Sequence, residues 1–260
     1  MNATLAWFAR VVGASVRVEL SKGLHAQLIL GVLIGPVSSA IYILMARQLG
    51  RTDATVYVVL APMMLGMWGT AITTSGEAVA SERGEGTLEL LIAAPAPAAL
   101  VAIGKILTTT TESLLAVPLT LIIAVALGMP LAIEHPGHFA VALAALTLST
   151  AAVGLLFASV FVLARSTRLF QNVIGLPLWI LSGVAFPLAL LPDSIRPLSA
   201  LVALSWNAAV LRASATALGP WWWFGLGAAI VLSVVYFVLG ARLFVGVERR
   251  VRVDGSLSTF

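Results

Sequence analysis

Long runs of apolar residues alternate with short polar segments along the whole chain. A helix needs about 20 mostly apolar residues to cross a bilayer. Six segments meet this requirement and predict six membrane-spanning helices, over residues 24–46, 55–74, 98–127, 139–164, 170–191 and 221–245. The third segment is long enough to tilt or to extend beyond the bilayer. We therefore expect an all-α membrane protein with a single domain over residues 1–260.

Two further segments are apolar without being able to span a bilayer. Residues 1–22 place Arg10 and Arg17 roughly on one helical face, which predicts an interfacial helix on the inner leaflet; a frayed extension is the alternative. Residues 186–220 are broken by prolines into pieces too short to span. Irregular backbone at membrane depth must be covered by protein or face water. We expect a re-entrant helical hairpin there, packed on the external side of the bundle.

Composition supports this class of protein and excludes others. Hydrophobic residues make up 60% of the chain and charged residues 10%, against about 25% charged in soluble domains. The chain has no cysteine, which excludes disulfides, thiolate nucleophiles and cysteine-bound metals. Its formal charge is +4, but no basic stripe with interleaved aromatic residues indicates nucleic-acid binding.

The positions of the basic residues predict the orientation of the helices. If the N-terminus is cytoplasmic, four basic residues fall outside, namely Arg47, Arg51, Arg196 and Arg212. The other basic residues fall on or near the inner side. Lysine and arginine accumulate on the cytoplasmic side of membrane proteins, so both termini are expected to be cytoplasmic. The triplet Trp221–Trp223 then lies at the outer interface, where amphipathic rings prefer to lie.

A short charged segment between the second and third spans carries the most specific chemistry. It reads SERGEGTLELLIAAP over residues 81–95. Gly84 and Gly86 break the helix that continues from the second span, and Thr87 can cap a new short helix. A net acidic inner loop is unfavourable beside anionic lipids unless a protein covers it. We expect this segment to bind a cytoplasmic partner; the alternative is a solvated loop.

This segment resembles the cytoplasmic signature of the ABC-2 family of ABC transporter permeases. The matching residues are Glu82, Glu85, Gly86, Thr87, Leu88, Glu89, Leu90, Leu91, Pro95, Gly104 and Lys105. A second stretch is similar to the fifth helix and external hairpin of that family, through Gly183, Phe186, Pro187, Leu191, Pro192, Pro197 and Arg212. The family often has Pro-Leu-Thr near Ser205-Trp206, and this chain does not.

The resemblance implies a mechanism. Two permeases, identical or different, pair with two cytoplasmic ATP-binding subunits that hold ATP and magnesium. The segment over residues 82–95 corresponds to the coupling helix, which sits in a groove of the ATPase. Its expected coupling residues are Glu82, Arg83, Glu85, Gly86, Thr87, Leu88, Glu89 and Leu91. The interfacial helix of the family corresponds to residues 1–22.

The chain itself has no ATP site, because Gly104-Lys105 lacks the first glycine and the Ser or Thr of a phosphate-binding loop. It is therefore expected to bind no cofactor itself. We also expect no catalytic residue and no metal site; the alternative is a metal held by Glu134, His135 and His138 in the external loop EHPGH, which we interpret as a solvated loop. An ionisable residue within a span is a functional hypothesis by default. We assign the substrate path to Glu112, Asn172, Trp179 and Phe186; the alternatives are an ion pair for Glu112 and an interhelical bond for Asn172.

The expected function is a multi-pass permease of a bacterial cytoplasmic membrane that exports amphiphilic or apolar cargo such as a drug, antibiotic or lipid. An importer and a polysaccharide or lipid-glycan exporter remain alternatives. A secondary transporter would need several buried carboxylates or broken helices at the midplane, and Glu112 is one candidate. An intramembrane enzyme and a structural assembly subunit are further alternatives.

Overall fold

The computed structural model describes residue 13 and residues 26–50, 55–84, 98–161 and 167–254. Within these ranges every regular element is helical, as expected for an all-α protein. The expected interfacial helix over residues 1–22 and most of the expected coupling segment lie outside the described residues.

In the part of the chain that the structure describes, four helices are long and apolar enough to cross a bilayer, and a fifth apolar helix is shorter. The four candidate spans are Thr55–Thr73, Ile103–Ala126, Pro136–Phe161 and Trp222–Gly246, and the shorter apolar stretch is Val32–Gln48. These segments fall within five of the six predicted spans or differ from them by a few residues. A multi-pass membrane protein follows, because each candidate span approaches or exceeds the length that a bilayer requires.

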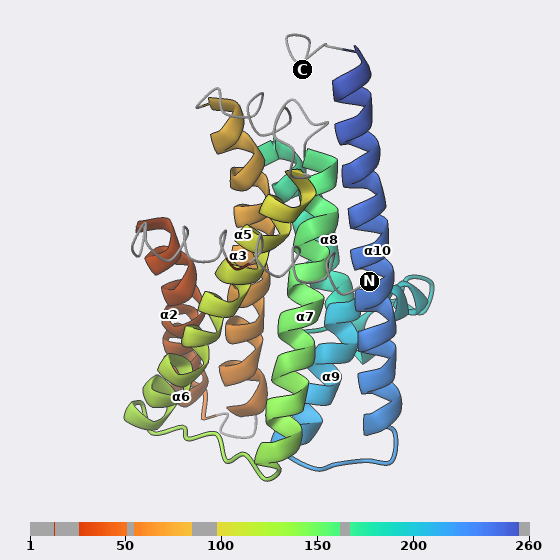
Figure 1. The fold of residues 1–260 in the computed structure, drawn as a ribbon. Helices are drawn as coiled ribbons and strands as arrows, with labels where there is room; N and C mark the ends of the chain where they lie inside the picture. The colour runs from red at the N-terminus through yellow and green to blue at the C-terminus, as the bar shows by residue number, and fades with distance from the viewer. Residues whose placement is uncertain (1–12, 14–25, 51–54, 85–97, 162–166, 255–260) are drawn as a thin grey trace.

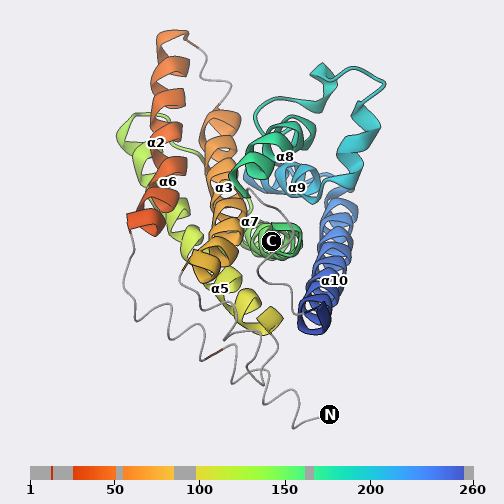
Figure 2. The same ribbon diagram turned by 90° about the horizontal axis from the view of Figure 1, so that it is seen from above.

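The helices form one bundle whose two ends can be named from Figure 1. Helix α3 (Thr55–Gly84), helix α7 (Pro136–Phe161) and helix α10 (Trp222–Asp254) all begin at its lower end. Helix α2 (Ala26–Gln48) descends beside α3. Viewed from above, α2 lies on one side of the bundle and α10 on the other, with α3 and α7 between them (Figure 2).

The third predicted span is present but interrupted. Helix α5 (Ala98–Glu112) is followed by a 3-10 turn, η2 (Ser113–Leu115), and then by helix α6 (Ala116–Ala126). Pro118 lies in the first turn of α6, where it has no N–H to donate to the carbonyl of Leu114 and its ring crowds that carbonyl. The 3-10 turn, whose hydrogen bonds join residues three apart, accommodates the missing α-helical hydrogen bond. The break therefore follows from one residue that the hydropathy pattern does not register.

The fifth predicted span ends earlier than expected. Helix α8 (Thr167–Ser182) stops at Ser182, whereas the sequence predicted helix to residue 191. Gly183 adopts φ 61°, a left-handed conformation that ends helices and that glycine tolerates best. The backbone N–H of Val184 then donates to Ser182 Oγ. Pro187 follows and disfavours helix at the residue before it.

The expected hairpin region contains three short elements. These are η3 (Leu188–Leu190), η4 (Arg196–Leu201) and helix α9 (Ala203–Ala215). Helix α8 lies in the upper part of the bundle and α9 in its lower part (Figure 1). Helix α9 packs against both α7 and α10, which also pack on each other, and ten of its thirteen residues are buried.

Candidate functional site

The expected coupling residues lie at and beyond the upper end of α3. The candidate span within α3 ends at Thr73, but the helix continues to Gly84, about 16 Å further at a rise of about 1.5 Å per residue. Glu82 and Arg83 belong to this extension. Gly84 is also the last described residue before residue 98, so the break predicted at Gly84 and Gly86 stays a prediction. Glu85, Gly86, Thr87, Leu88, Glu89 and Leu91 lie outside the described residues, so the coupling helix stays a prediction.

Glu112 lies deep within the bundle. It is the last residue of α5 and is half-buried. Its distance from the lower end of the third span at Ala126 is roughly 20 Å by helical rise, which places it near the middle of the candidate span Ile103–Ala126. A carboxyl group at this depth is costly to keep charged. Among the described residues, Glu112 is the one acidic residue that lies inside a candidate span.

The hydroxyl groups of the four threonines before Glu112 form hydrogen bonds within their own helix. Each hydroxyl donates to the carbonyl four residues earlier, from Thr108 to Gly104 O through Thr111 to Leu107 O, at 2.6 to 3.0 Å. The sequence left open whether these hydroxyls line a path or bond back to the helix. The structure favours the second, so their hydrogens are not available to a passing molecule.

The other predicted path residues lie on and after α8. Trp179 is 38% exposed, and its ring lies beside Gly69 of α3. Phe186 follows the end of α8 and is half-buried. Asn172 is in α8, but its side chain is not among those described. Both α8 and the third span pack against α3, so the predicted path residues flank α3 from two directions.

The exposed face of α8 is apolar and carries one aromatic ring. Its members are Val173, Leu176, Trp179 and Ile180, which are 38 to 69% exposed. Near the upper end, the amide of Gln171 reaches the carbonyls of Ile72 and Thr73 at 3.3 and 3.4 Å. These bonds hold the upper part of α8 on α3. Val173 and Leu176 are the most exposed members of the apolar face, whereas the ring of Trp179 lies beside Gly69 of α3.

Arg212 joins three elements near the end of α8. Its guanidinium donates to the carbonyls of Gly183 and Val184 at 3.2 and 3.1 Å, and it lies over the ring of Tyr57 with 4.6 Å to the centroid. The last carbonyls of a helix have no partner within that helix. Because α8 ends inside the bundle, the positive group of Arg212 satisfies the chain just past its end and also favours the negative end of the helix dipole.

A buried polar chain joins α9 to α7 and α10. The amide of Asn207 donates to Ser149 Oγ at 2.8 Å and to Ala203 O at 2.8 Å. The hydroxyls of Ser149 and Ser233 are 2.5 Å apart, and Ser233 donates to Ala229 O. Ser233 uses its hydrogen on that carbonyl, so Ser149 donates to Ser233. This chain lies roughly 20 Å from the lower end by the rise along α7.

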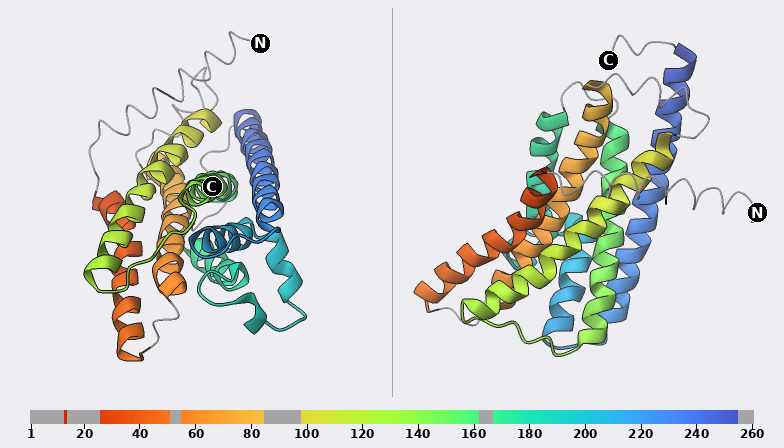
Figure 3. Two further views of the ribbon diagram at one scale, coloured as in Figure 1. Left: turned by 90° about the horizontal axis from the view of Figure 1, so that it is seen from below. Right: turned by 60° about the vertical axis from the view of Figure 1, so that its left-hand side comes forward.

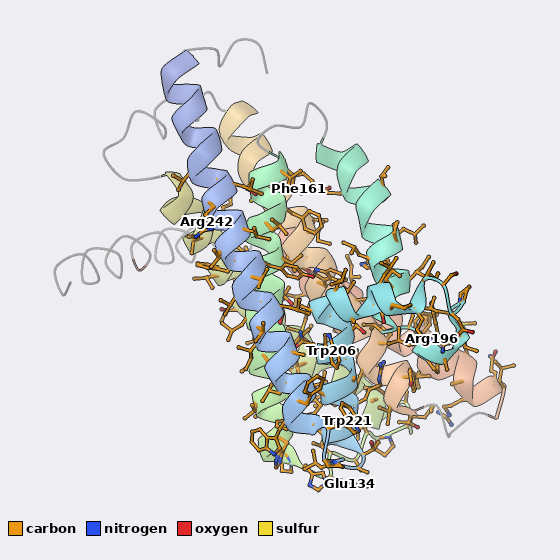
Figure 4. All side chains as sticks on the ribbon, turned by 90° about the vertical axis from the view of Figure 1, so that its right-hand side faces the viewer. Glu134, Phe161, Arg196, Trp206, Trp221 and Arg242 are labelled. Atoms are coloured by element: carbon orange, nitrogen blue, oxygen red, sulfur yellow. The ribbon has the colours of Figure 1, made fainter. Side chains whose placement is uncertain are left out.

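The lower end of α9 is fixed by an aromatic group and a loop. The ring N–H of Trp222 lies 3.2 Å from Val210 O and 2.9 Å from Ser214 Oγ. Backbone amides of Glu134 and His135 donate to the carbonyls of Ala215 and Ser214. His138 packs edge-on against Trp222, with 4.7 Å between ring centroids. Glu134 and Trp221 lie together toward this end in Figure 4.

The segment between α8 and α9 is closed by Arg196. It donates to the carbonyls of Ala189 and Leu191 and forms an ion pair with Asp193 at 2.9 Å. Figure 4 shows Arg196 to one side of the bundle, away from Phe161 and Arg242 near the upper end. The predicted hairpin thus contains two arginines, Arg196 and Arg212, that donate hydrogen bonds to backbone carbonyls.

Sequence reasoning missed Tyr57, Asn207, Ser149 and Ser233 and gave Arg212 no physical role. A signal for two of them existed, since Asn207 and Arg212 are polar residues in an otherwise apolar segment. Their partners belong to other helices and are distant in sequence. The arrangement binds helices together and leaves apolar faces open, which suits a conduit or an assembly surface more than bond-breaking chemistry.

A family model described as ABC-2 type transporter matches residues 21–216, which includes α2 through α9. A search of curated proteins found no match to the chain.

Proposed function

The chain belongs to the ABC-2 type transporter family, and we propose that it is the membrane subunit of an ATP-driven exporter of amphiphilic or hydrophobic small molecules. The observation that carries this proposal is the family match over residues 21–216, on a chain with four candidate membrane spans. A membrane component of such a transporter is not itself the ATPase, and this chain has no phosphate-binding loop.

The energy for transport comes, in this proposal, from two cytoplasmic ATP-binding subunits that hold ATP and magnesium. Permeases of this family are generally expected to work with ATP-binding subunits. A second permease, identical or related, completes the complex. ATP-driven closure of the two ATPases moves the coupling segments, and the permeases alternate between inward-facing and outward-facing states.

The proposed contact with the ATPase is the segment over residues 82–95. The extension of α3 supports this assignment, because it carries Glu82 and Arg83 roughly 13 to 15 Å beyond the end of the apolar span at Thr73. In this proposal, residues at that height lie outside the hydrocarbon region, where a cytoplasmic protein binds. Glu89 and the leucines around it would bind in the ATPase groove.

The proposed topology has six crossings with both termini in the cytoplasm of a bacterium. The crossings are α2, α3, the third span with its 3-10 turn, α7, α8 together with the region after it, and α10. The upper end in Figure 1 is then cytoplasmic. Lys105 and Arg242 belong to the upper parts of their helices, in agreement with the bias of cations toward the inner side.

The proposed cargo is apolar or amphiphilic, such as a drug, antibiotic or lipid. The exposed face of α8 with Trp179 supports this class, because it offers apolar contact and an aromatic ring. The buried hydroxyls and amides described above are used between or within helices. A cargo with a positive charge would interact favourably with the carboxyl group of Glu112, which is half-buried at the middle of a candidate span.

Reconstitution with a cytoplasmic ATP-binding subunit from the same organism tests the proposal. Tagged chain is expected to retain a protein that hydrolyses ATP, and proteoliposomes holding both are expected to move a fluorescent amphiphile only with ATP and magnesium. Transport driven by an ion gradient without ATP would support the secondary transporter instead. Uptake by inside-out vesicles indicates export from the cell, and the opposite direction indicates import.

A further inference from the structure

The buried apolar side chains of the described residues form three clusters of unequal size. One small cluster consists of Ile43, Ala46, Val59, Ala124 and Met129, from α2, α3, α6 and the turn after it. The main cluster is built largely on α3, α7, α9 and α10. A third cluster joins α5 to α7 and α10. The two halves of the third span, α5 and α6, therefore belong to different clusters.

Helices α7, α9 and α10, called the block below, are joined by hydrogen bonds at two heights. The Asn207–Ser149–Ser233 chain crosses all three at mid-height. Trp222 donates to α9 near the lower end, and Tyr236 donates to the carbonyl of Leu201 just before α9. Bonds to partners on several helices at once resist sliding and rotation. The block is therefore built to move as one body.

Helices α2 and α6, called the arm below, form a second body. They run side by side and tilt away from the block toward the lower end (Figure 3). Arg47, in the last turn of α2, donates to the carbonyl of Leu127 at the end of α6 at 2.6 Å. Val117, in the first turn of α6, is the buried α6 residue in the main cluster. The arm packs on α3, which in turn packs on α7 of the block, so α3 lies between the two bodies.

The prolines follow the same division. Pro36 lies inside α2, Pro62 inside α3 and Pro118 in α6, and each removes one helical hydrogen bond. Helix α7 has proline only at its first residue, and neither α9 nor α10 contains one. Prolines that weaken the helical backbone therefore occur in the arm and in α3, which packs against both the arm and the block. They are absent from the interior of the block.

We propose that the arm moves as one unit against the block, with Ser113–Leu115 as the hinge of the third span. Helix α5 stays with the block through its contacts with α7 and α10, and α6 moves with α2. At the lower end the connection between them permits this motion: Met129 bonds back to α6, whereas Glu134 and His135 bond to α9. The intervening residues 130–133 then take up the change in distance. The motion does not depend on the proposed function, although its use in transport does.

The absence of cysteine allows spin labels to be placed without altering the background. We would label exposed positions in pairs: Val125→Cys with Val231→Cys across arm and block, and Val141→Cys with Val231→Cys within the block. Distances are measured by pulsed electron resonance on the chain alone in lipid nanodiscs. The arm–block pair is expected to give two distance populations and the block pair a single one.

Pro118→Ala restores the hydrogen bond to Leu114 and is expected to remove one of the two arm–block populations. Pro177→Ala, a change of the same kind inside α8, is the matched control and is expected to leave both populations. Size-exclusion profiles and circular dichroism verify that each variant folds. Equal single populations for both pairs, or two arm–block populations that persist in Pro118→Ala, would overturn the hinge. An ATPase that fails to bind would contradict the proposed function without changing this result.

Discussion

The guanidinium of Arg212 lies 4.6 Å from the centre of the Tyr57 ring while it donates to two carbonyls beyond the end of α8. One side chain thereby connects α9, α3 and α8 at a point where a helix ends inside the bundle. Such an ending would otherwise leave polar groups without partners in an apolar environment, which is costly. The first prediction tests this junction.

Arg212→Gln is expected to destabilise the protein by about 2 to 3 kcal/mol, because two hydrogen bonds from a charged donor are lost or weakened. Arg212→Lys keeps the charge but not the forked geometry, and its effect is expected to be intermediate. Thermal unfolding in detergent, followed by circular dichroism, measures the change. Tyr57→Phe keeps the ring and serves as the control; a loss as large as that of Arg212→Gln would contradict this account.

Asn207→Ala is expected to loosen α9, because it removes both donors that the amide supplies to Ser149 and Ala203. The expected cost is about 1 to 3 kcal/mol, typical of leaving buried partners unsatisfied. Hydrogen exchange read by mass spectrometry should show faster exchange over Ala203–Ala215. Thr147→Val, which removes a hydroxyl that bonds only within α7, is the control. Unchanged protection of α9 in Asn207→Ala would show that packing alone holds it.

Reversing the charge of the proposed coupling segment should separate insertion from assembly. Glu82→Lys combined with Glu89→Lys is expected to leave the amount of protein in the membrane unchanged and to abolish ATPase binding and transport. The reason is the loss of the negative rim proposed to meet the ATPase. Co-purification measures binding.

Glu134→Lys is the matched control for this pair, because Glu134 is exposed at the opposite end of the bundle. It is expected to bind the ATPase normally. If the double variant also assembles and transports at the normal rate, the coupling assignment is incorrect.

Glu112→Gln is expected to weaken transport of a cationic amphiphile by about tenfold while basal ATP hydrolysis persists, as for the loss of one charge interaction in a poorly hydrated site. Transport of a neutral analogue should change little. Rates measured side by side in proteoliposomes give the ratio. Thr111→Val, beside it and bonded to its own helix, is the control. An equal loss for both cargoes would indicate that Glu112 has a structural role.

The sequence predicted the crossings well where hydropathy decides the structure. Helices α2, α3, α7 and α10 begin close to the predicted boundaries, because burial of apolar side chains in lipid dominates their energy. The extension of α10 to Asp254 went beyond the prediction, since a helix in water is not marked by hydropathy.

Hydropathy predicted neither the interruption of the third span nor the early end of the fifth. Residues 98–127 carry a polar run over residues 108–113, and residues 170–191 are largely apolar. In neither segment does the hydropathy pattern distinguish a continuous helix from an interrupted one. Pro118 and Gly183 determine the breaks through backbone geometry. The importance of Arg212 depends on carbonyls that are 28 and 29 residues away in sequence. No local pattern in the chain encodes such a pairing.

The junction at Arg212 also constrains the order in which the protein is made. A ribosome delivers Val184 to the membrane 28 residues before the arginine that satisfies its carbonyl. During that interval α8 would have to wait beside the insertion machinery or against α3, since lipid offers its end no hydrogen bond. Nascent chains halted before Arg212 should therefore be degraded much faster than chains halted just after it, which makes the stable insertion of α8 depend on one cation.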